Sequence, residues 1–177
     1  INILEPFLEV TEEAFDLIYA INTKAAMVAA QEFSKTVIAA NRGGAIVNVS
    51  SISSFVGFAD HTSYCASKGA MDAMSRVIAN ELGQYGIRVN CISAGPFKTL
   101  AGAGVGGMDE MIAHQERKAA MKRANTGEEV GDAAVYLLSD LSSGVTGETI
   151  HVDEQLTLRT HYAGHVLGAV MVSARCR

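Results

Sequence analysis

Cysteine is scarce in this sequence, and the few cysteines present form no recognisable pattern. The 177 residues include three, Cys65, Cys91 and Cys176, and none belongs to a Cys-x-x-Cys pair. Scattered single cysteines argue against a disulfide-stapled secreted domain and against a zinc site. We therefore expect reduced thiols, no bound metal and a cytoplasmic location.

An excess of basic residues, a long apolar run and a signal peptide are also missing. Lysine and arginine number 14 against 19 acidic residues, so a net charge of −5 provides no positive field to attract nucleic acid. The longest apolar run, 166–172, is far shorter than the about 20 residues that span a bilayer. Residues 1–10 lack the basic start and apolar stretch of a signal peptide. We expect neither a nucleic-acid partner nor a membrane partner.

What is present is the composition of one globular domain. Apolar residues make up 49% of the chain and charged residues 19%, and a chain of this length buries roughly 70% of its surface on folding. The first residue is isoleucine, and residues 1–10 form a proline-containing connection before a helix. From this start we expect a fragment or a truncated product.

Apolar periodicity and turn residues predict alternating helices and buried strands. Thr11 suits the start of a first helix, while Ser63 and Gly86 suit the start and the left-handed end of a second. Thr126 and Glu129 form a capping box for a third. The predicted helices are 11–41, 63–85 and 126–139, and the predicted strands are 45–51, 87–93 and 149–153. This order predicts an α/β fold with a doubly wound parallel sheet and crossover helices.

The last part of the chain has a different pattern. Residues 154–177 fit neither a helix nor a strand well, and we interpret them as an atypical tail that follows a domain at 1–153. The pattern leaves open whether this tail is ordered. His161 and His165 lie four residues apart, but no third ligand candidate is near them in sequence, so we predict no metal site there.

The pair that carries chemistry is Tyr64 and Lys68. Their spacing of four residues on the second helix directs both side chains to one face. A cation about 4 Å from a phenol, at an effective dielectric of about 20, favours the phenolate by roughly 4 kcal/mol, or up to ~3 pKa units before burial opposes it. The spacing therefore predicts a Tyr64 with a lowered pKa, able to exchange a proton near neutral pH.

Ser51 is the third candidate, because it ends the strand at 45–51 and lies 13 residues before Tyr64. Open α/β sheets bind their ligands at the carboxyl ends of strands, where a hydroxyl can bind a carbonyl oxygen while Tyr64 gives or takes the proton. Taken alone, a Tyr-x-x-x-Lys pair on a helix is usually a solvent-exposed pair without a catalytic role, and a serine at a strand end is usually a turn residue. Their combination is much rarer.

These motifs resemble the short-chain dehydrogenase/reductase family, and the resemblance covers about residues 1–153. It implies a Rossmann-like domain that transfers hydride with NAD or NADP. The matching segments, in order, are Ile-Asn-Thr at 21–23, Val-Asn-Val-Ser-Ser at 47–51, Tyr-Cys-Ala-Ser-Lys at 64–68, Ile-Arg-Val-Asn at 87–90, Ser-Ala-Gly-Pro at 93–96 through Thr99, and 147–153.

The resemblance implies a role for each matching residue. Tyr64 would be the acid/base, Lys68 would lower its pKa and hold the nicotinamide ribose, and Ser51 would polarise the carbonyl. Asn22 would anchor a water that relays protons; the alternative, without the family pattern, is an amide on a helix surface. The residues that would line the nicotinamide and its neighbouring phosphate are Gly95, Pro96, Phe97 and Thr99.

The sequence departs from the family at its N-terminal side. The phosphate-binding glycine loop, which should follow a first strand and open a helix, does not occur, and the glycine-rich segment 103–107 comes too late in the chain. We therefore expect an incomplete Rossmann-like sheet that lacks roughly its first third and binds dinucleotide weakly. The residue that selects NAD or NADP would lie in the missing part.

A second departure concerns the substrate. Residues 92–153 resemble bacterial enoyl-acyl-carrier-protein reductases, whose catalytic lysine lies seven positions after the tyrosine, and here position 71 is methionine. The Tyr64 to Lys68 spacing belongs to the carbonyl-reducing branch, which we favour. Met108, Met111, Ile112 and Met121 in the expected substrate loop are either lid packing or an acyl-chain pocket.

We therefore predict an NAD(P)(H)-dependent oxidoreductase that acts on a small carbonyl or alcohol substrate. One alternative is an enoyl-thioester reductase of fatty-acid synthesis that acts on an acyl thioester. Another is a catalytically silent fragment that serves only as an oligomerising module. The helices at 11–41 and 63–85 correspond to those that members of the family pair across subunits, so a homo-oligomer, a dimer or a tetramer, is expected.

Overall fold

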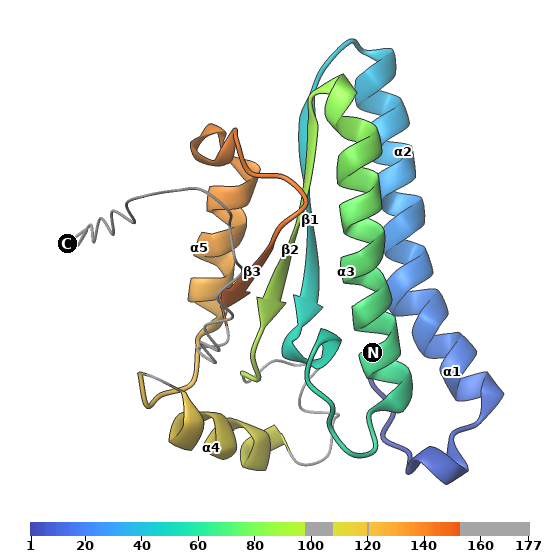
Figure 1. The fold of residues 1–177 in the computed structure, drawn as a ribbon, viewed down its shortest axis with the longest axis vertical. Coiled ribbons are helices and arrows are strands. Elements are labelled where there is room, and N and C mark those ends of the chain that lie inside the picture. The colour runs from blue at the N-terminus through green and yellow to red at the C-terminus, as the bar shows by residue number, and fades with distance from the viewer. Residues whose placement is uncertain (98–107, 120, 153–177) are drawn as a thin grey trace, which may run out of the picture.

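The structure, a computed structural model, describes residues 1–97, 108–119 and 121–152. Its centre is a parallel sheet of three strands in the order β1 (Gly44–Ser51), β2 (Ile87–Ala94) and β3 (Thr149–Val152). Helices cross between successive strands, as shown in Figure 1. The predicted α/β fold with a parallel sheet and crossover helices is confirmed. The predictions for 154–177, including those for His161 and His165, concern residues outside the described part of the chain.

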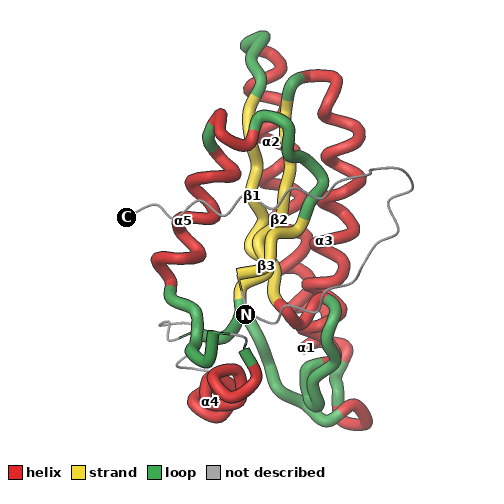
Figure 2. Tube along the Cα trace, turned by 60° about the vertical axis from the view of Figure 1, so that its left-hand side comes forward, coloured by secondary structure: helices red, strands yellow, loops and turns green. Residues whose placement is uncertain are grey.

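Helices cover both faces of the sheet. Helix α2 (Ala25–Ala39) and helix α3 (Thr62–Leu82) pack on one face, and helix α5 (Gly127–Leu138) packs on the other (Figures 1 and 2). Helix α4 (Met108–Lys118) lies beyond the carboxyl ends of the strands. The core between α3 and the sheet contains Ala79, Ile87 and Val89, with partly buried neighbours Val37, Ile38, Ile46, Ile78 and Leu82.

The helix predicted at 11–41 is not continuous. It comprises α1 (Glu12–Tyr19), a π-helical segment (Ala20–Lys24) and α2, and the Thr11 hydroxyl caps its start by accepting a hydrogen bond from the Ala14 N–H at 3.2 Å. The wider turn holds Asn22 and Thr23 against α3, where both side chains bind Ser67. π-Helical turns often occur at functional sites, and this one buries the amide predicted to be catalytic.

The start of α3 also differs from the prediction. The helix begins at Thr62, so Ser63 lies inside it and is buried, and the prediction of Ser63 as the cap is wrong. His61 occupies the cap position, where its carbonyl accepts from the Cys65 N–H at 2.8 Å while its side chain makes no capping bond. The predicted end is confirmed, because after a 3-10 turn (Gly83–Tyr85) Gly86 has a left-handed φ of 69°.

The capping box of α5 is present as predicted. The Glu129 N–H donates to the Thr126 hydroxyl at 3.2 Å, and the Thr126 N–H donates to the Glu129 carboxylate at 2.8 Å. The Arg123 guanidinium contacts the same carboxylate, and these bonds lower the pKa of Glu129 to about 2.

Among the helices of the described part of the chain, none combines the length and the apolar character needed to cross a membrane.

Candidate active site

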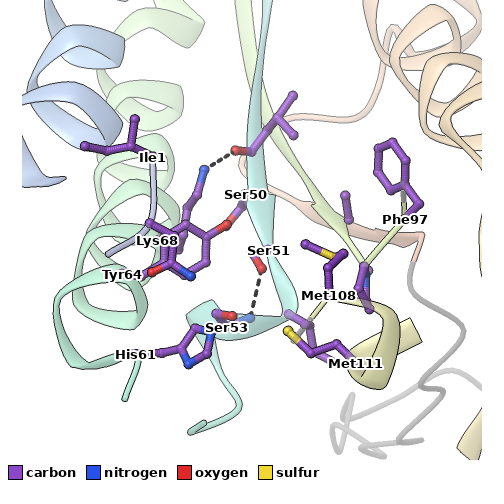
Figure 3. Close-up of a pocket in the computed structure, with 16 residues that line it drawn as sticks. Ile1, Ser50, Ser51, Ser53, His61, Tyr64, Lys68, Phe97, Met108 and Met111 are labelled. Carbon is purple, nitrogen blue, oxygen red and sulfur yellow. Dashed lines mark hydrogen bonds between the residues drawn. The ribbon is translucent and has the colours of Figure 1, made fainter. Parts of the chain in front are cut away.

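A cavity of about 340 Å³ lies at the carboxyl ends of β1 and β2. This is the edge at which open parallel sheets bind ligands. Strand β1 contributes Ser51, helix α3 contributes Tyr64 and Lys68, and helix α4 contributes Met108 and Met111. Figure 3 shows Ser51 between the Tyr64 and Lys68 side chains and the two methionines. Ser51, Tyr64 and Lys68, which were predicted from two separate motifs, therefore line the same cavity.

The predicted lowering of the Tyr64 pKa is wrong for this structure. Burial of the phenol raises its pKa above the ordinary value of 10.0, and a hydrogen bond with the Ser51 hydroxyl lowers it by less. The Lys68 ammonium lies 5.7 Å from the centroid of the Tyr64 ring. Loss of water around the phenol is the largest contribution and sets the direction of the pKa shift.

The Lys68 ammonium bridges the helix and the strand. It donates a hydrogen bond to the Val49 carbonyl at 2.8 Å. Burial lowers the pKa of Lys68, and the neighbouring carboxylate of Asp72, which lies one helical turn further along α3, opposes that effect. Asp72 is itself buried, and one of its carboxylate oxygens has no partner in the described part of the chain. Lys68 therefore lies in the cavity wall, and the buried carboxylate of Asp72 lies one helical turn further along α3.

Ser51 is positioned by its place at the end of β1. It is buried, and its hydroxyl accepts a hydrogen bond from the Ser53 N–H at 3.2 Å at the start of the 3-10 turn Ile52–Ser54. Its own O–H makes a hydrogen bond with the Tyr64 phenol, which lowers the pKa of the phenol. A carbonyl oxygen that binds beside Tyr64 and Ser51 could accept a hydrogen bond from the same O–H.

Asn22 does not line the cavity but is connected to its wall. Its amide donates to the Ile1 carbonyl at 2.8 Å and to the Ser67 hydroxyl at 3.1 Å, and Ile1 is a lining residue. Of the predicted nicotinamide-binding segment, Gly95, Pro96 and Phe97 line the cavity. Thr99 lies outside the described residues, as does the glycine-rich segment 103–107.

The cavity is also lined by Asn2, Ser50 and His61, to which no role was assigned from the sequence. Each carries a buried polar atom without a hydrogen-bond partner in the described structure. His61 lies three residues before Tyr64, and residues at that spacing share one face of a helix. This signal was missed because the helix was expected to begin at Ser63, after His61. Ser50 and Asn2 gave no comparable signal.

The sequence profile of the family described as Enoyl-(Acyl carrier protein) reductase matches residues 2–157. The chain belongs to the short-chain dehydrogenase/reductase family. The predicted resemblance is thereby confirmed.

Two curated relatives carry different names at similar identity. The chain is 38% identical over 147 residues to an enoyl-[acyl-carrier-protein] reductase [NADH] of Bacillus cereus, covering 83% of this chain and 56% of that protein. It is 39% identical over 155 residues to the L-xylulose reductase of Bos taurus, covering 85% and 62%. The chain therefore spans about six-tenths of the length of these relatives, and identity alone does not choose between the two activities.

A solved structure supports the same fold. The crystal structure of the Bacillus cereus enoyl-acyl carrier protein reductase with NADP+ and indole naphthyridinone matches with a TM-score of 0.78 and 37% identity. The match covers 85% of this chain and 58% of that chain. The three-stranded sheet and its helices thus correspond to part of a larger domain in that enzyme.

Proposed function

We propose that the chain provides the catalytic part of an NAD(P)(H)-dependent oxidoreductase that interconverts a carbonyl and an alcohol. The observation that carries this proposal is the meeting of Ser51, Tyr64 and Lys68 in the wall of one cavity. These are a hydrogen-bond donor, a proton donor and a cation. Similarity to the L-xylulose reductase of Bos taurus supports the same chemistry.

The residues act on the carbonyl oxygen. Because burial raises the pKa of Tyr64, the phenol is protonated at neutral pH and can donate its proton to an oxygen that gains negative charge during reduction. The Ser51 hydroxyl donates a second hydrogen bond to the same oxygen. The Lys68 ammonium supplies positive charge close to the phenol, which favours the phenolate that remains after proton transfer.

The residues present fit a nicotinamide at this cavity. Gly95 has no side chain and is buried in the lining, so a flat ring can approach its backbone closely. The Lys68 ammonium has three N–H donors and one described hydrogen bond, to Val49, which leaves donors for ribose hydroxyls. When bound, the nicotinamide supplies or accepts the hydride. We propose Tyr64, Lys68, Gly95, Pro96 and Phe97 as the residues that hold it.

A second candidate function is the reduction of an enoyl thioester. It is favoured by the apolar wall of Met108 and Met111, which an acyl chain could contact, and by the description of the matching family. Position 71, where enoyl reductases are expected to carry their lysine, holds a buried methionine. We therefore rank this function second.

We also propose that copies of the chain associate as dimers or tetramers and that the protein is cytoplasmic. The association is supported by apolar side chains exposed on the helices of one layer. A monomeric chain would leave this surface in water. The residues are Leu17, Ile21, Met27, Val28, Phe33 and Val77.

The proposal is tested by following NADH and NADPH oxidation by the purified chain with a small ketone and with an enoyl thioester. We expect ketone reduction to be preferred, and Tyr64→Phe to lower its rate by about 100-fold or more because the proton donor is lost. The affinity for the dinucleotide, measured by calorimetry, should fall far less than the rate, because the substitution removes one hydroxyl and keeps the aromatic ring. Tyr85→Phe, which alters an exposed residue outside the cavity, is the matched control.

Other outcomes are equally informative. A clear preference for the enoyl thioester would replace the first function with the second. Unchanged ketone reduction by Tyr64→Phe would reject Tyr64 as the proton donor. Absence of both turnover and dinucleotide binding would favour a silent module that only self-associates.

A further inference from the structure

The cavity wall contains polar atoms that the protein itself does not satisfy. Asn2 Oδ1, Ser50 Oγ and His61 Nε2 are buried and have no hydrogen-bond partner in the described part of the chain. All three residues line the cavity that also contains Tyr64. Buried polar atoms in folded proteins nearly always have a partner. Three exceptions around one cavity point to a ligand that supplies the missing bonds.

His61 is the best defined of the three. Its side chain is 8% exposed, and its Nδ1 lies 2.6 Å from the Ala59 carbonyl oxygen. A carbonyl oxygen can only accept, so Nδ1 must carry the proton, and a neutral ring then presents Nε2 as an acceptor. The imidazole is also packed against Tyr64, with ring centroids 6.4 Å apart in an edge-on arrangement. Its orientation is therefore fixed next to the proposed proton donor.

The chemical type of these atoms limits what can bind them. Asn2 Oδ1 and His61 Nε2 are both acceptors, and the Ser50 hydroxyl can accept as well. Only a ligand with hydrogen-bond donors can satisfy them. A hydrocarbon chain, a thioester and a simple ketone have no such donors, whereas every hydroxyl group has one.

In Figure 3, His61 and Tyr64 lie on the same side of the cavity, and Ser51 lies between Tyr64 and the methionines. Because the His61 ring packs edge-on against Tyr64, a hydroxyl on a carbon next to a carbonyl held by Tyr64 would be the group to reach Nε2.

We propose that His61 binds a hydroxyl group of the substrate beside the reacting carbonyl, and that the substrate is a polyhydroxylated ketone or the corresponding polyol. Ser50 and Asn2 accept hydrogen bonds from further hydroxyls. The inference names the substrate class of the proposed function and rests on it. It also favours the carbonyl-reducing function over the enoyl-thioester function, because neither the thioester group nor an acyl chain has a donor for His61 Nε2.

The direct test is nitrogen NMR of the imidazole rings in the full chain, titrated with erythrulose and with butan-2-one. The two ketones share a four-carbon skeleton, but only erythrulose carries hydroxyls. We expect the Nε2 resonance of His61, assigned with His61→Phe, to shift with erythrulose and to stay in place with butan-2-one. His114, which is exposed on α4 outside the cavity lining, should shift with neither. An unmoved Nε2 at saturating erythrulose would overturn the proposal.

Kinetics provide a second readout that a merely structural role would not produce. His61→Phe should lower kcat/KM for erythrulose by about 10-fold, the value of one hydrogen bond, and leave butan-2-one nearly unchanged. His61→Gln retains an acceptor and should restore part of the loss, and His114→Phe should have no effect. An equal loss for both ketones would mean that His61 only supports the loop, which overturns the proposal.

The two readouts distinguish the failure of this inference from the failure of the proposed function. A chain that reduces neither ketone, but whose His61 Nε2 shifts with erythrulose, would retain the hydroxyl-binding site and lose the oxidoreductase function. A chain that reduces both ketones equally well, with no shift at Nε2, would retain the oxidoreductase function and lose the role of His61.

Discussion

At Tyr64, two effects act on one phenol in opposite directions. Burial favours the neutral form and raises the pKa, whereas the Ser51 hydroxyl favours the charged form through a hydrogen bond. The nearby Lys68 is itself buried, and burial lowers its pKa. The Tyr64 phenol keeps its proton at neutral pH and can donate it, which is the step that carbonyl reduction needs.

This balance predicts a late ionisation of Tyr64. Because the folded chain holds the phenolic proton more tightly than the unfolded chain, Tyr64 should ionise above pH 10, seen as the difference in phenolate absorbance between the wild type and Tyr64→Phe. The unfolded phenol ionises first, so the wild type should lose stability as pH rises past 10. Tyr64→Phe should lose less, as measured by urea unfolding. Ionisation of Tyr64 below pH 10 would show that the ammonium outweighs burial.

At the scale of elements, Arg88 connects strand β2 to the end of α5. One guanidinium nitrogen donates to the Leu137 carbonyl at 2.8 Å and to the Ser142 hydroxyl at 2.9 Å, and the other donates to the Ser139 carbonyl at 3.1 Å. These acceptors include carbonyls at the C-terminus of a helix, which lack partners within the helix. Arg88 therefore satisfies a helix end and fixes α5 against the sheet.

Removal of this side chain should loosen α5. We expect Arg88→Ala to lower the free energy of unfolding by about 2–3 kcal/mol, because charged hydrogen bonds are lost and their acceptors stay partly buried. Arg88→Lys should recover only part of this, since a single ammonium cannot reproduce the planar fork. Urea unfolding followed by circular dichroism measures both. Arg42→Ala, at an exposed position, is the control, and an equal effect of the two alanine variants would exclude the proposed role of Arg88.

The elements also show what the sequence could predict. β1 and β2 were predictable because apolar runs between turn residues are typical of strands buried on both faces, and the α5 capping box was predictable because it is local. Ser51, Tyr64 and Lys68 were found through spacing, since strand ends and helix starts meet at one edge of a parallel sheet.

What could not be predicted depends on contacts between distant segments. The π-helical turn exists where Asn22 and Thr23 bind Ser67, 45 and 44 residues away, and no local pattern encodes such bonds. The sign of the Tyr64 pKa shift follows from how deeply the cavity buries the phenol. The unpaired His61 Nε2 became visible only once the Ala59 carbonyl was found to occupy the other ring nitrogen.

At the scale of the whole molecule, the helical layer formed by α1, α2 and α3 exposes several large apolar side chains to solvent. The exposed fractions of Leu17, Ile21 and Val28, which lie on α1, the π-helical segment and α2 in turn, are 48%, 45% and 43%. Phe33 and Val77 extend the apolar character to the rest of α2 and to α3. Apolar side chains gathered in this way mark surfaces that bind other proteins, and a second copy of the chain offers the same surface in return.

We expect the purified chain to scatter light as a dimer or a tetramer at micromolar concentration. Ile21→Glu combined with Val28→Glu should shift the mass to that of the 18.7 kDa monomer, because burying two carboxylates without partners is costly. The same substitutions lie on an exposed surface, so circular dichroism should show an unchanged fold. Leu141→Glu, at a position 82% exposed after α5, tests the opposite side of the sheet. If the wild type is a dimer, this variant should remain a dimer. If the wild type is a tetramer, the variant should at most separate it into dimers. A wild-type chain that is strictly monomeric would contradict the proposed association.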